Sequence, residues 1–271
     1  MRSLELTPTG SPLEATSAGA EARKLEVAGV SKVFRSRRNE TVALDGVDLH
    51  VDDGELVCLL GSSGCGKSTL LSIVGGLETA TGGAVFIDGD RVVGPGADRA
   101  MVFQGYSLFP WLSVARNIQF GLEVVNWPKA RRAERVRELL AIMGLGEFAD
   151  ALPKELSGGM RQRVAIARAL APEPDILLLD EPFGALDAVT KRVMQDFLLS
   201  VWKRTGTTIL MVTHDVEEAL YLSSRIYLMA ARPGRIAEEI VVPFDGSRGP
   251  TIMRDPRFLD LRAELSDMLV G

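Results

Sequence analysis

The sequence has little of what several classes of protein require. It contains two cysteines, Cys58 and Cys65, so it can form neither a disulfide framework nor a four-cysteine zinc site. It lacks any run of about 18 apolar residues, the length that a membrane-spanning helix needs. Acidic residues outnumber basic ones by 36 to 31, and the net charge of −5 excludes a strongly basic nucleic-acid binder. The 271 residues suffice for one large domain or two small ones, each with a buried core.

The first part of the chain predicts a tail followed by half-buried strands. Residues 1–22 are rich in Ser, Thr, Gly, Pro and Ala and lack the apolar stretch of a signal peptide, so we expect a flexible tail. Short apolar segments alternate with turns from Lys24 to Val51 and again from Ala84 to Val93, where Asp88-Gly89 is a turn signal. This alternation predicts antiparallel strands with one solvated face.

A second kind of strand is apolar throughout. Such continuous runs are typical of strands that are buried on both faces, and helical stretches between them indicate an α/β fold with a parallel sheet. The runs are Leu56–Leu60, Ala100–Phe103, Ile176–Asp180, Thr208–Val212 and Ile226–Met229.

Two segments outside this pattern predict helices. Val136, Leu139, Leu140 and Met143 follow the spacing of one helix face, and Gly144 is a stop signal, so we interpret residues 105–160 as a mostly helical insertion. Near the C-terminus, Asp255-Pro256 is a helix start. An apolar stripe follows it and predicts a terminal helix docked on the body, through Phe258, Leu261, Leu265 and Met268.

A glycine-rich loop directly after the first apolar run matches G-x-x-x-x-G-K-[ST], the phosphate-binding pattern. Glycines let backbone N–H groups turn toward an anion, and the following helix adds its positive end. Lys67 can reach the β- and γ-phosphates, and the Ser68 hydroxyl can ligate Mg²⁺. The loop therefore predicts a nucleoside triphosphate site formed by Gly61, Ser62, Ser63, Gly64, Cys65, Gly66, Lys67, Ser68 and Thr69.

Two carboxylates end the apolar run at Ile176. In a nucleotide-binding α/β sheet such a strand delivers Asp180 to its C-terminal tip beside the phosphate loop, where it can hold Mg²⁺. Glu181, one residue further on, can act as the general base for an attacking water. The alternative is a purely structural role, in which Asp180-Glu181-Pro182 starts a helix.

A second glycine pair precedes another helix-forming stretch. Ser157, Gly158 and Gly159 lie at the predicted helix N-terminus, which makes a second anion site that one nucleotide alone does not explain. Together with the phosphate loop, this segment resembles the ATPase subunits of ABC transporters over about Lys24 to Val242. Leu156–Met160 matches the signature motif of that family, except that Met160 replaces the commoner glutamine.

The resemblance implies roles for further residues. Gln104 matches the glutamine that senses the γ-phosphate through Mg²⁺ and water, although Gly105 departs from the polar residue expected next. Asp187 matches the loop that crosses between subunits, and His214 matches the switch histidine. The resemblance also implies a head-to-tail dimer in which Ser157 of one subunit faces the ATP of the other.

Two aromatic positions keep two interpretations open. Phe34 either stacks on adenine, as in the family, or is a core strand residue. The segment Tyr106–Leu112, with Trp111, is either core or a groove for a short helix of a membrane partner. Of the remaining polar candidates, Cys65 is expected to have no catalytic role and Cys58 to be a buried strand residue. His50 is expected to end a strand and be solvated.

The sequence thus predicts a P-loop NTPase core with an antiparallel β subdomain and a helical insertion: a tail over 1–22, an ATPase domain over 23–244 and an extension over 245–271. The segment Ala231–Ile236 and the residues after Gln104 resemble importers of nitrate, sulfonate and taurine. We expect an ATP- and Mg²⁺-dependent subunit at the inner face of the membrane, partnered by a second ATPase subunit, a permease and, indirectly, an external solute-binding protein. The alternative is an ABC ATPase that acts on nucleic acid or ribosomes.

Overall fold

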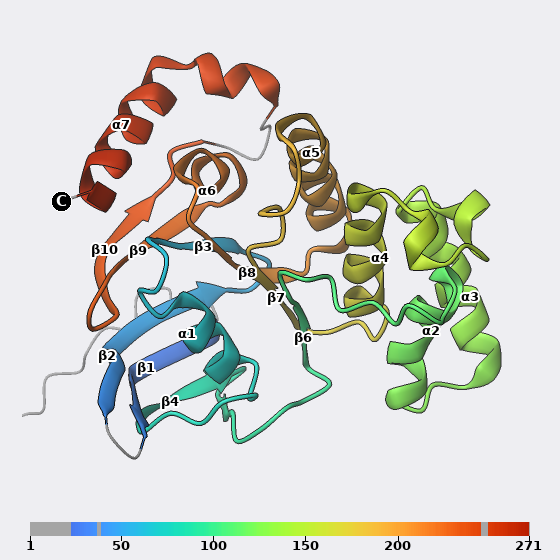
Figure 1. Cartoon of the computed structure of the whole chain (residues 1–271), viewed down its shortest axis with the longest axis horizontal. Coiled ribbons are helices and arrows are strands. Elements are labelled where there is room, and N and C mark those ends of the chain that lie inside the picture. Colours follow the sequence, from blue (N-terminus) through green and yellow to red (C-terminus); the bar gives the residue numbers. More distant parts are fainter. Residues whose placement is uncertain (1–22, 37–38, 245–248, 271) are drawn as a thin grey trace, which may run out of the picture.

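The computed structural model describes residues 23–36, 39–244 and 249–270, except the side chains of Pro250 and Val270. The tail expected over residues 1–22 lies outside this described part. The described residues form two sheets with helices packed on them, and the glycine-rich loop of residues 61–66 lies where the two sheets approach each other (Figure 1).

A six-stranded sheet forms the centre, in the order β10-β9-β3-β8-β7-β6. The five apolar runs are its parallel strands, so that prediction is confirmed. The antiparallel strand β10 at one edge was not predicted, because most of its residues are exposed and they form no continuous apolar run. The strands are β3 (Leu56–Gly61), β6 (Arg99–Val102), β7 (Ile176–Asp180), β8 (Thr208–Thr213), β9 (Arg225–Ala230) and β10 (Arg235–Val241).

This sheet separates two hydrophobic cores. Because successive side chains of a strand point to opposite faces, neighbouring residues belong to different cores. Leu177 and Leu179 pack with the helical side of the molecule, whereas Ile176 and Leu178 pack with the second sheet. Burial on both faces explains why these strands are apolar throughout.

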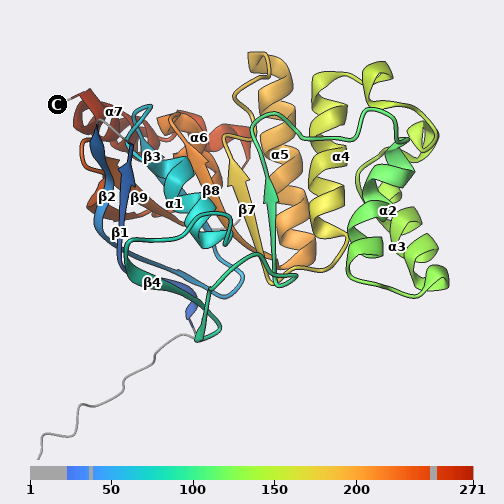
Figure 2. The same cartoon turned by 60° about the horizontal axis from the view of Figure 1, so that its bottom comes forward.

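The second sheet is antiparallel, in the order β2-β1-β4-β5, as the alternating pattern predicts. Asp88 and Gly89 form the tight turn between the last two strands, both with positive φ. Helix α1 (Lys67–Val74) packs between the two sheets (Figure 2). The strands are β1 (Arg23–Arg35), β2 (Glu40–Asp52), β4 (Gly82–Ile87) and β5 (Asp90–Arg91).

The helical insertion lies beyond the last strand, β6, at the far end from the antiparallel sheet (Figure 2). The predicted face of α3 is buried through Val136, Leu139 and Leu140, and Gly144 follows its end with a positive φ of 64°. Helix α4 begins at Gly158 and continues past the boundary expected near residue 160, because it also packs against α2 and β6. The elements are α2 (Val114–Val124), α3 (Lys129–Ile142), η1 (Gly146–Phe148), η2 (Pro153–Glu155) and α4 (Gly158–Leu170).

The C-terminal helix packs against α6, which lies over β3 and β8. Phe258 and Leu265 of the predicted stripe are fully buried and Leu261 is half-buried. Met268 is 44% exposed, so its inclusion in the stripe was wrong; it lies near the helix end, beyond the packed surface. The remaining elements are α5 (Ala188–Thr205), α6 (Val216–Leu222), η3 (Pro250–Arg254) and α7 (Pro256–Val270).

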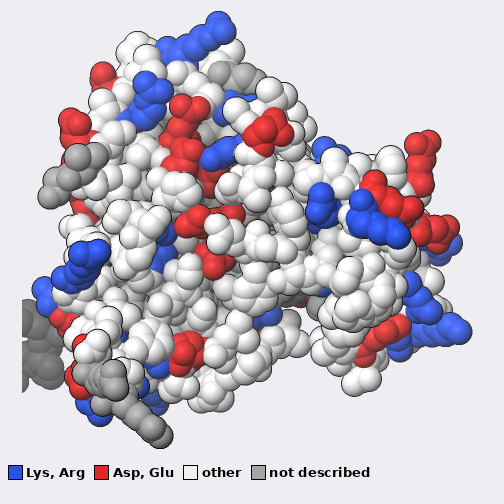
Figure 3. All heavy atoms as spheres, viewed as in Figure 1, with Lys and Arg blue, Asp and Glu red and all other residues white. Residues whose placement is uncertain are grey.

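Charged side chains of both signs are interspersed over the face seen in Figure 3, which carries no continuous basic area. That distribution gives no support to a nucleic-acid-binding surface on this face. None of the helices in the described ranges combines the length and apolarity that crossing a bilayer requires.

Candidate nucleotide-binding site

The phosphate loop joins the C-terminal end of β3 to the start of α1. Gly64 and Gly66 have positive φ values of 81° and 104°, so side chains would be strained there. A Cβ on Gly66 would also lie 2.7 Å from Leu44 Cδ2, because the loop packs closely on β2. Residues Ser63, Gly64 and Gly66–Thr69 line a cavity of about 630 Å³. The sequence pattern therefore lies in the strand–loop–helix context that phosphate binding requires.

Lys67 is buried, with 4% of its surface exposed. Its Nζ donates hydrogen bonds to the carbonyl oxygens of Gly61, at 2.7 Å, and Ser62, at 2.9 Å. Within the described residues this ammonium has no carboxylate partner, so carbonyl oxygens of the loop hold it where an anion would bind. Cys65 is also buried and packs beneath the loop, in the core between the sheets, while Cys58 is buried in the central sheet.

Ser68 and Asp180 come together as the sequence predicts. The Ser68 hydroxyl donates to Asp180 Oδ1 over 3.0 Å. Burial raises the pKa of the Asp180 carboxyl, against the hydrogen bond from Ser68, while the neighbouring Glu181 raises it further and Lys67 lowers it. A hydroxyl beside a carboxylate supplies the hard oxygen ligands that Mg²⁺ prefers, with the remaining positions left to phosphate and water. Among the described residues, no cluster of three or more His, Cys, Asp and Glu offers an all-protein metal site.

Gln104, Glu181 and His214 converge on one oxygen atom. Glu181 Oε2 lies 3.1 Å from His214 Nδ1 and accepts a hydrogen bond from Gln104 Nε2 over 3.4 Å. The three residues follow β6, β7 and β8, whose carboxyl ends meet at one edge of the parallel sheet. Glu181 also lines the phosphate-loop cavity.

The backbone of Glu181 is held in an unusual conformation. Its φ of 43° lies in the left-handed region, which costs a non-glycine residue about 1–2 kcal/mol. Its N–H donates to the carbonyl of Val212 over 3.0 Å, and its carbonyl accepts from Gly184, so the strained residue is tied on both sides. Strain that the surroundings enforce in this way is typical of functional sites.

The signature segment lies apart from this cavity. Ser157 caps α4 by accepting a hydrogen bond from the Met160 backbone N–H over 3.3 Å, and none of Leu156–Met160 lines the cavity. Helix α4 packs in the core on the opposite face of the central sheet from α1 (Figure 2). A Cβ on Gly159 would lie 3.0 Å from Thr190 Cγ2, so this glycine permits close packing on α5. Because Met160 contributes only its backbone N–H to this cap, the cap forms with methionine as it would with the commoner glutamine.

Asp187 caps the next helix. Its carboxylate accepts hydrogen bonds from the backbone N–H groups of Thr190, at 3.0 Å, and Val189, at 3.1 Å. Hydrogen bonds from Thr190 and Val189 lower the pKa of the exposed Asp187 carboxyl. The residue thus fixes the start of α5 at the loop that follows Glu181.

Phe34 and Trp111 both lie at the surface, which argues against a core role for either. Phe34 is 42% exposed at the end of β1 and is paired with Thr41, which lines the nucleotide cavity. Trp111 is 72% exposed and packs against Phe109, at 5.7 Å between ring centroids. Buried Asn117 holds this loop by donating to the carbonyls of Phe109 and Leu112. The aromatic patch of Phe109, Trp111 and Phe120 is therefore a supported surface.

Sequence reasoning missed five residues of the cavity wall, Thr41–Ala43 of β2 and Arg232-Pro233 of the β9–β10 turn. The only sequence signal for these residues was the segment Ala231–Ile236, which resembles a group of importers but did not indicate a binding site. These residues reach the phosphate loop through tertiary contacts alone.

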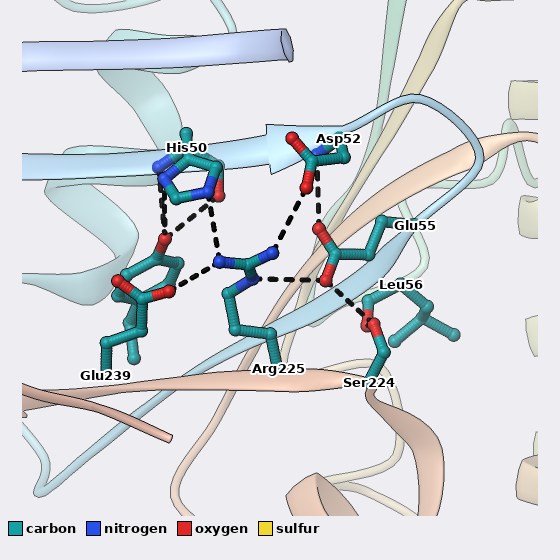
Figure 4. Close-up of polar contacts among 8 residues, drawn as sticks. His50, Asp52, Glu55, Leu56, Ser224, Arg225 and Glu239 are labelled. Carbon is teal, nitrogen blue, oxygen red and sulfur yellow. Dashed lines mark hydrogen bonds and ion pairs between the residues drawn. The ribbon is translucent and has the colours of Figure 1, made fainter. Parts of the chain in front are cut away.

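A second polar cluster lies at the amino ends of β3 and β9, the opposite end of the sheet (Figure 4). Arg225 donates to Glu55 Oε1 and Asp52 Oδ2, each at 3.1 Å, and also pairs with Glu239. Its Nη1 lies 2.9 Å from Nε2 of the His50 ring. The backbone N–H of His50 donates a hydrogen bond to the Tyr227 hydroxyl. His50, which was expected to be solvated, is instead half-buried and bonded to Arg225 and Tyr227, two residues of β9 that lie 175 and 177 positions further along the chain.

Comparisons with known proteins agree with this geometry. The family described as ABC transporter matches residues 44–184. The nitrate import ATP-binding protein NrtD of Synechocystis sp. is 47% identical over 253 residues, covering 91% of this chain and 95% of that protein. The taurine import ATP-binding protein TauB of Pelagibacter ubique is 46% identical, covering 89% and 92%. A dimeric post-hydrolysis structure of the ATP-binding cassette MJ0796, bound to ADP and Pi, superposes with a TM-score of 0.70 at 33% identity, covering 82% of this chain and 100% of that one.

Proposed function

The chain belongs to the ABC transporter family, and from that premise we propose that it is the subunit that energises import of a small anion such as nitrate, sulfonate or taurine. It is an ATP hydrolase whose reaction is coupled to transport. One observation carries the proposal most strongly: the side chains of Gln104, Glu181 and His214 meet at the edge of the phosphate-loop cavity.

ATP binding is assigned to the phosphate loop. The backbone N–H groups of residues 61–69 and the ammonium of Lys67 bind the phosphates, and the carbonyls of Gly61 and Ser62 keep that ammonium at the loop. Phe34 stacks on the adenine from the end of β1. Ser68, Asp180 and Gln104 are the residues that would hold Mg²⁺, which neutralises charge on the β- and γ-phosphates when bound.

Hydrolysis is assigned to the converging side chains. Glu181 accepts a proton from a water molecule as the water oxygen attacks the γ-phosphorus, and the bond to the ADP oxygen breaks. His214, 3.1 Å from Glu181, orients the carboxylate and donates toward the γ-phosphate. Gln104 has both a donor and an acceptor in its amide, which suits a sensor of the water and the γ-phosphate.

The complete site is assigned to two copies of the chain. The signature residues and the phosphate loop lie on opposite sides of the central sheet, so one copy supplies only half of the groups around an ATP. In a head-to-tail pair, Ser157 and Gly158 of one copy face the γ-phosphate bound by the other. The dimeric form of the related cassette MJ0796 supports this arrangement.

A membrane permease is the proposed partner of the aromatic patch. Trp111, Phe109 and Phe120 are held at the surface of the helical insertion, in the part that follows Gln104, so a helix inserted there would act on the residues around the γ-phosphate. Large aromatic side chains of this kind are enriched at protein interfaces. In this proposal the chain lies at the inner face of the membrane, bound to the permease, and the transported solute does not contact it.

Affinity purification of the tagged chain from solubilised membranes tests the proposal. We expect an integral membrane protein to co-purify, and vesicles containing the complex to take up the anion only with ATP inside. The Lys67→Ala variant, which retains the aromatic patch, is the matched control and should assemble without transport. Recovery of nucleic acid in place of a membrane protein would overturn the transport function.

A further inference from the structure

The β9–β10 turn, residues 231–234, contributes to the wall of the nucleotide cavity. Arg232 and Pro233 line this cavity together with the phosphate loop. Arg232 is exposed, and the described residues provide no ion-pair partner for its guanidinium. Its φ of 60° lies in the left-handed region, so the turn holds this arginine in a conformation that is costly for it. An unpaired cation held beside a nucleotide cavity has charge available for a ligand.

The turn is locked onto both neighbouring walls. Gly234 donates its N–H to the carbonyl of Ala43 over 3.0 Å and accepts from the N–H of Asp45 over 3.0 Å. Arg235 forms an ion pair with Asp45 at the same place. A Cβ on Gly234 would lie 2.2 Å from the carbonyl oxygen of Cys65, so the turn rests directly on the back of the phosphate loop. These contacts fix the turn, and with it the backbone of Arg232, relative to β2 and the phosphate loop.

The contacts of the turn locate Arg232 on the β2 side of the cavity. Ala43 is its anchor on β2, and Thr41, two residues before, pairs with Phe34. The phosphates are assigned to the loop and to Lys67, so the β2 side of the cavity is left for the base and the ribose. A planar, weakly hydrated guanidinium is well suited to stack on a purine ring.

We propose that Arg232 is a nucleotide-binding residue that packs its guanidinium on the purine ring, opposite Phe34. This proposal rests on the ATP-binding function proposed above and adds a second contact to the nucleoside half of the ligand. Pro233 stiffens the turn next to it.

Isothermal titration calorimetry with ATP and ADP, on the full chain, tests the proposal. Arg232→Ala is expected to raise the Kd of ATP and of ADP alike, by about tenfold, because a desolvated cation–π contact is lost from both complexes. Arg232→Met keeps the length of the side chain and removes the charge, and should show a similar loss while preserving the packing of the turn. Arg91→Ala removes an exposed charge on β5 outside the cavity and is the matched control, with an unchanged Kd.

A double-mutant cycle locates the contact. If both side chains hold one purine ring, the effects of Phe34→Ala and Arg232→Ala are non-additive. Additive effects, an unchanged Kd in both Arg232 variants, or a loss confined to ATP would each overturn the proposal, the last because it puts the guanidinium at the γ-phosphate. A parent chain that fails to bind ATP would instead overturn the proposed function.

Discussion

Polar clusters occupy both ends of the central sheet, and they are built differently. At the amino end, Arg225 is 16% exposed and donates to three carboxylates, so the cluster satisfies itself. At the carboxyl end, His214 is 53% exposed, Gln104 reaches Glu181 only at 3.4 Å, and Glu181 has a strained backbone. At the amino end the polar groups are therefore bonded to one another and stabilise the fold, whereas at the carboxyl end they remain available to bind a ligand.

The largest effect is expected from Glu181→Gln at the carboxyl end. The substitution keeps the shape and removes the base, so kcat for ATP hydrolysis should fall by about a thousandfold while ATP still binds. Glu55→Gln at the amino end is the matched control: it weakens the contact with Arg225, so we expect a loss of about 1 kcal/mol in the free energy of unfolding and an unchanged kcat. Steady-state turnover and urea unfolding measure the two effects, and a Glu181→Gln variant with parental turnover would rule out Glu181 as the base.

Arg225→Met is expected to have the largest effect on stability. It leaves Asp52, Glu55 and Glu239 close together without their shared cation, which should lower the free energy of unfolding by about 2–3 kcal/mol. Urea denaturation gives this value, and the Kd of ATP should stay unchanged because the cluster lies at the opposite end of the sheet. If the variant binds ATP more weakly but is as stable as the parent, the amino end of the sheet does not serve stability alone.

Lys191→Met tests an internal pair that lies near the functional end. Lys191 of α5 binds Asp215, the residue after His214 that caps α6, at 2.7 Å, and Glu218 of α6 at 2.9 Å. Burial opposes ionisation of Asp215, but the hydrogen bonds from Lys191 and from the Glu218 N–H prevail and lower its pKa. The ionised carboxylate therefore stabilises the fold above its unfolded pKa of about 3.9, and this stability is lost as the pH falls through the lower folded pKa.

We expect Lys191→Met to lower the free energy of unfolding by about 1–2 kcal/mol at pH 7. The difference from the parent should shrink in more acidic solution, once Asp215 is protonated in both states. Urea unfolding at a series of pH values measures it, with Lys203→Met on the same helix as the exposed control. A difference that does not change with pH would mean that Lys191 acts through packing alone.

The smallest effect on the isolated chain is expected from Trp111→Ala. Because the side chain is 72% exposed, its removal should change the free energy of unfolding by less than about 0.5 kcal/mol. Recovery of the permease in co-purification should nevertheless fall. If stability falls as much as assembly does, the aromatic patch is a structural support and not a docking surface.

Most of the fold can be predicted from the sequence because the burial of each strand determines its local pattern of apolar residues. Continuous apolar runs identify the parallel strands, which are buried on both faces, and alternation identifies the second sheet. Strand β10 was not predicted because an exposed edge strand does not require an apolar pattern. Met268 was misplaced because a periodic stripe does not tell where packing ends.

The candidate site is predicted unevenly for a similar reason. The phosphate loop, Asp180 and Glu181 lie in contiguous motifs whose glycines and carboxylates carry their chemistry locally. The contacts of His50 and the position of Arg232 depend on strands that are distant in sequence, and nothing in their immediate neighbours reports these contacts.

The separation of Ser157 from the phosphate loop has a consequence for the kinetics of the proposed enzyme. A catalytic unit assembled from two half-sites exists only while two chains are together, so the rate per chain is not a constant of the chain. In dilute solution the total rate would grow with the square of the chain concentration. A permease that holds two copies side by side would raise their effective concentration and remove that dependence.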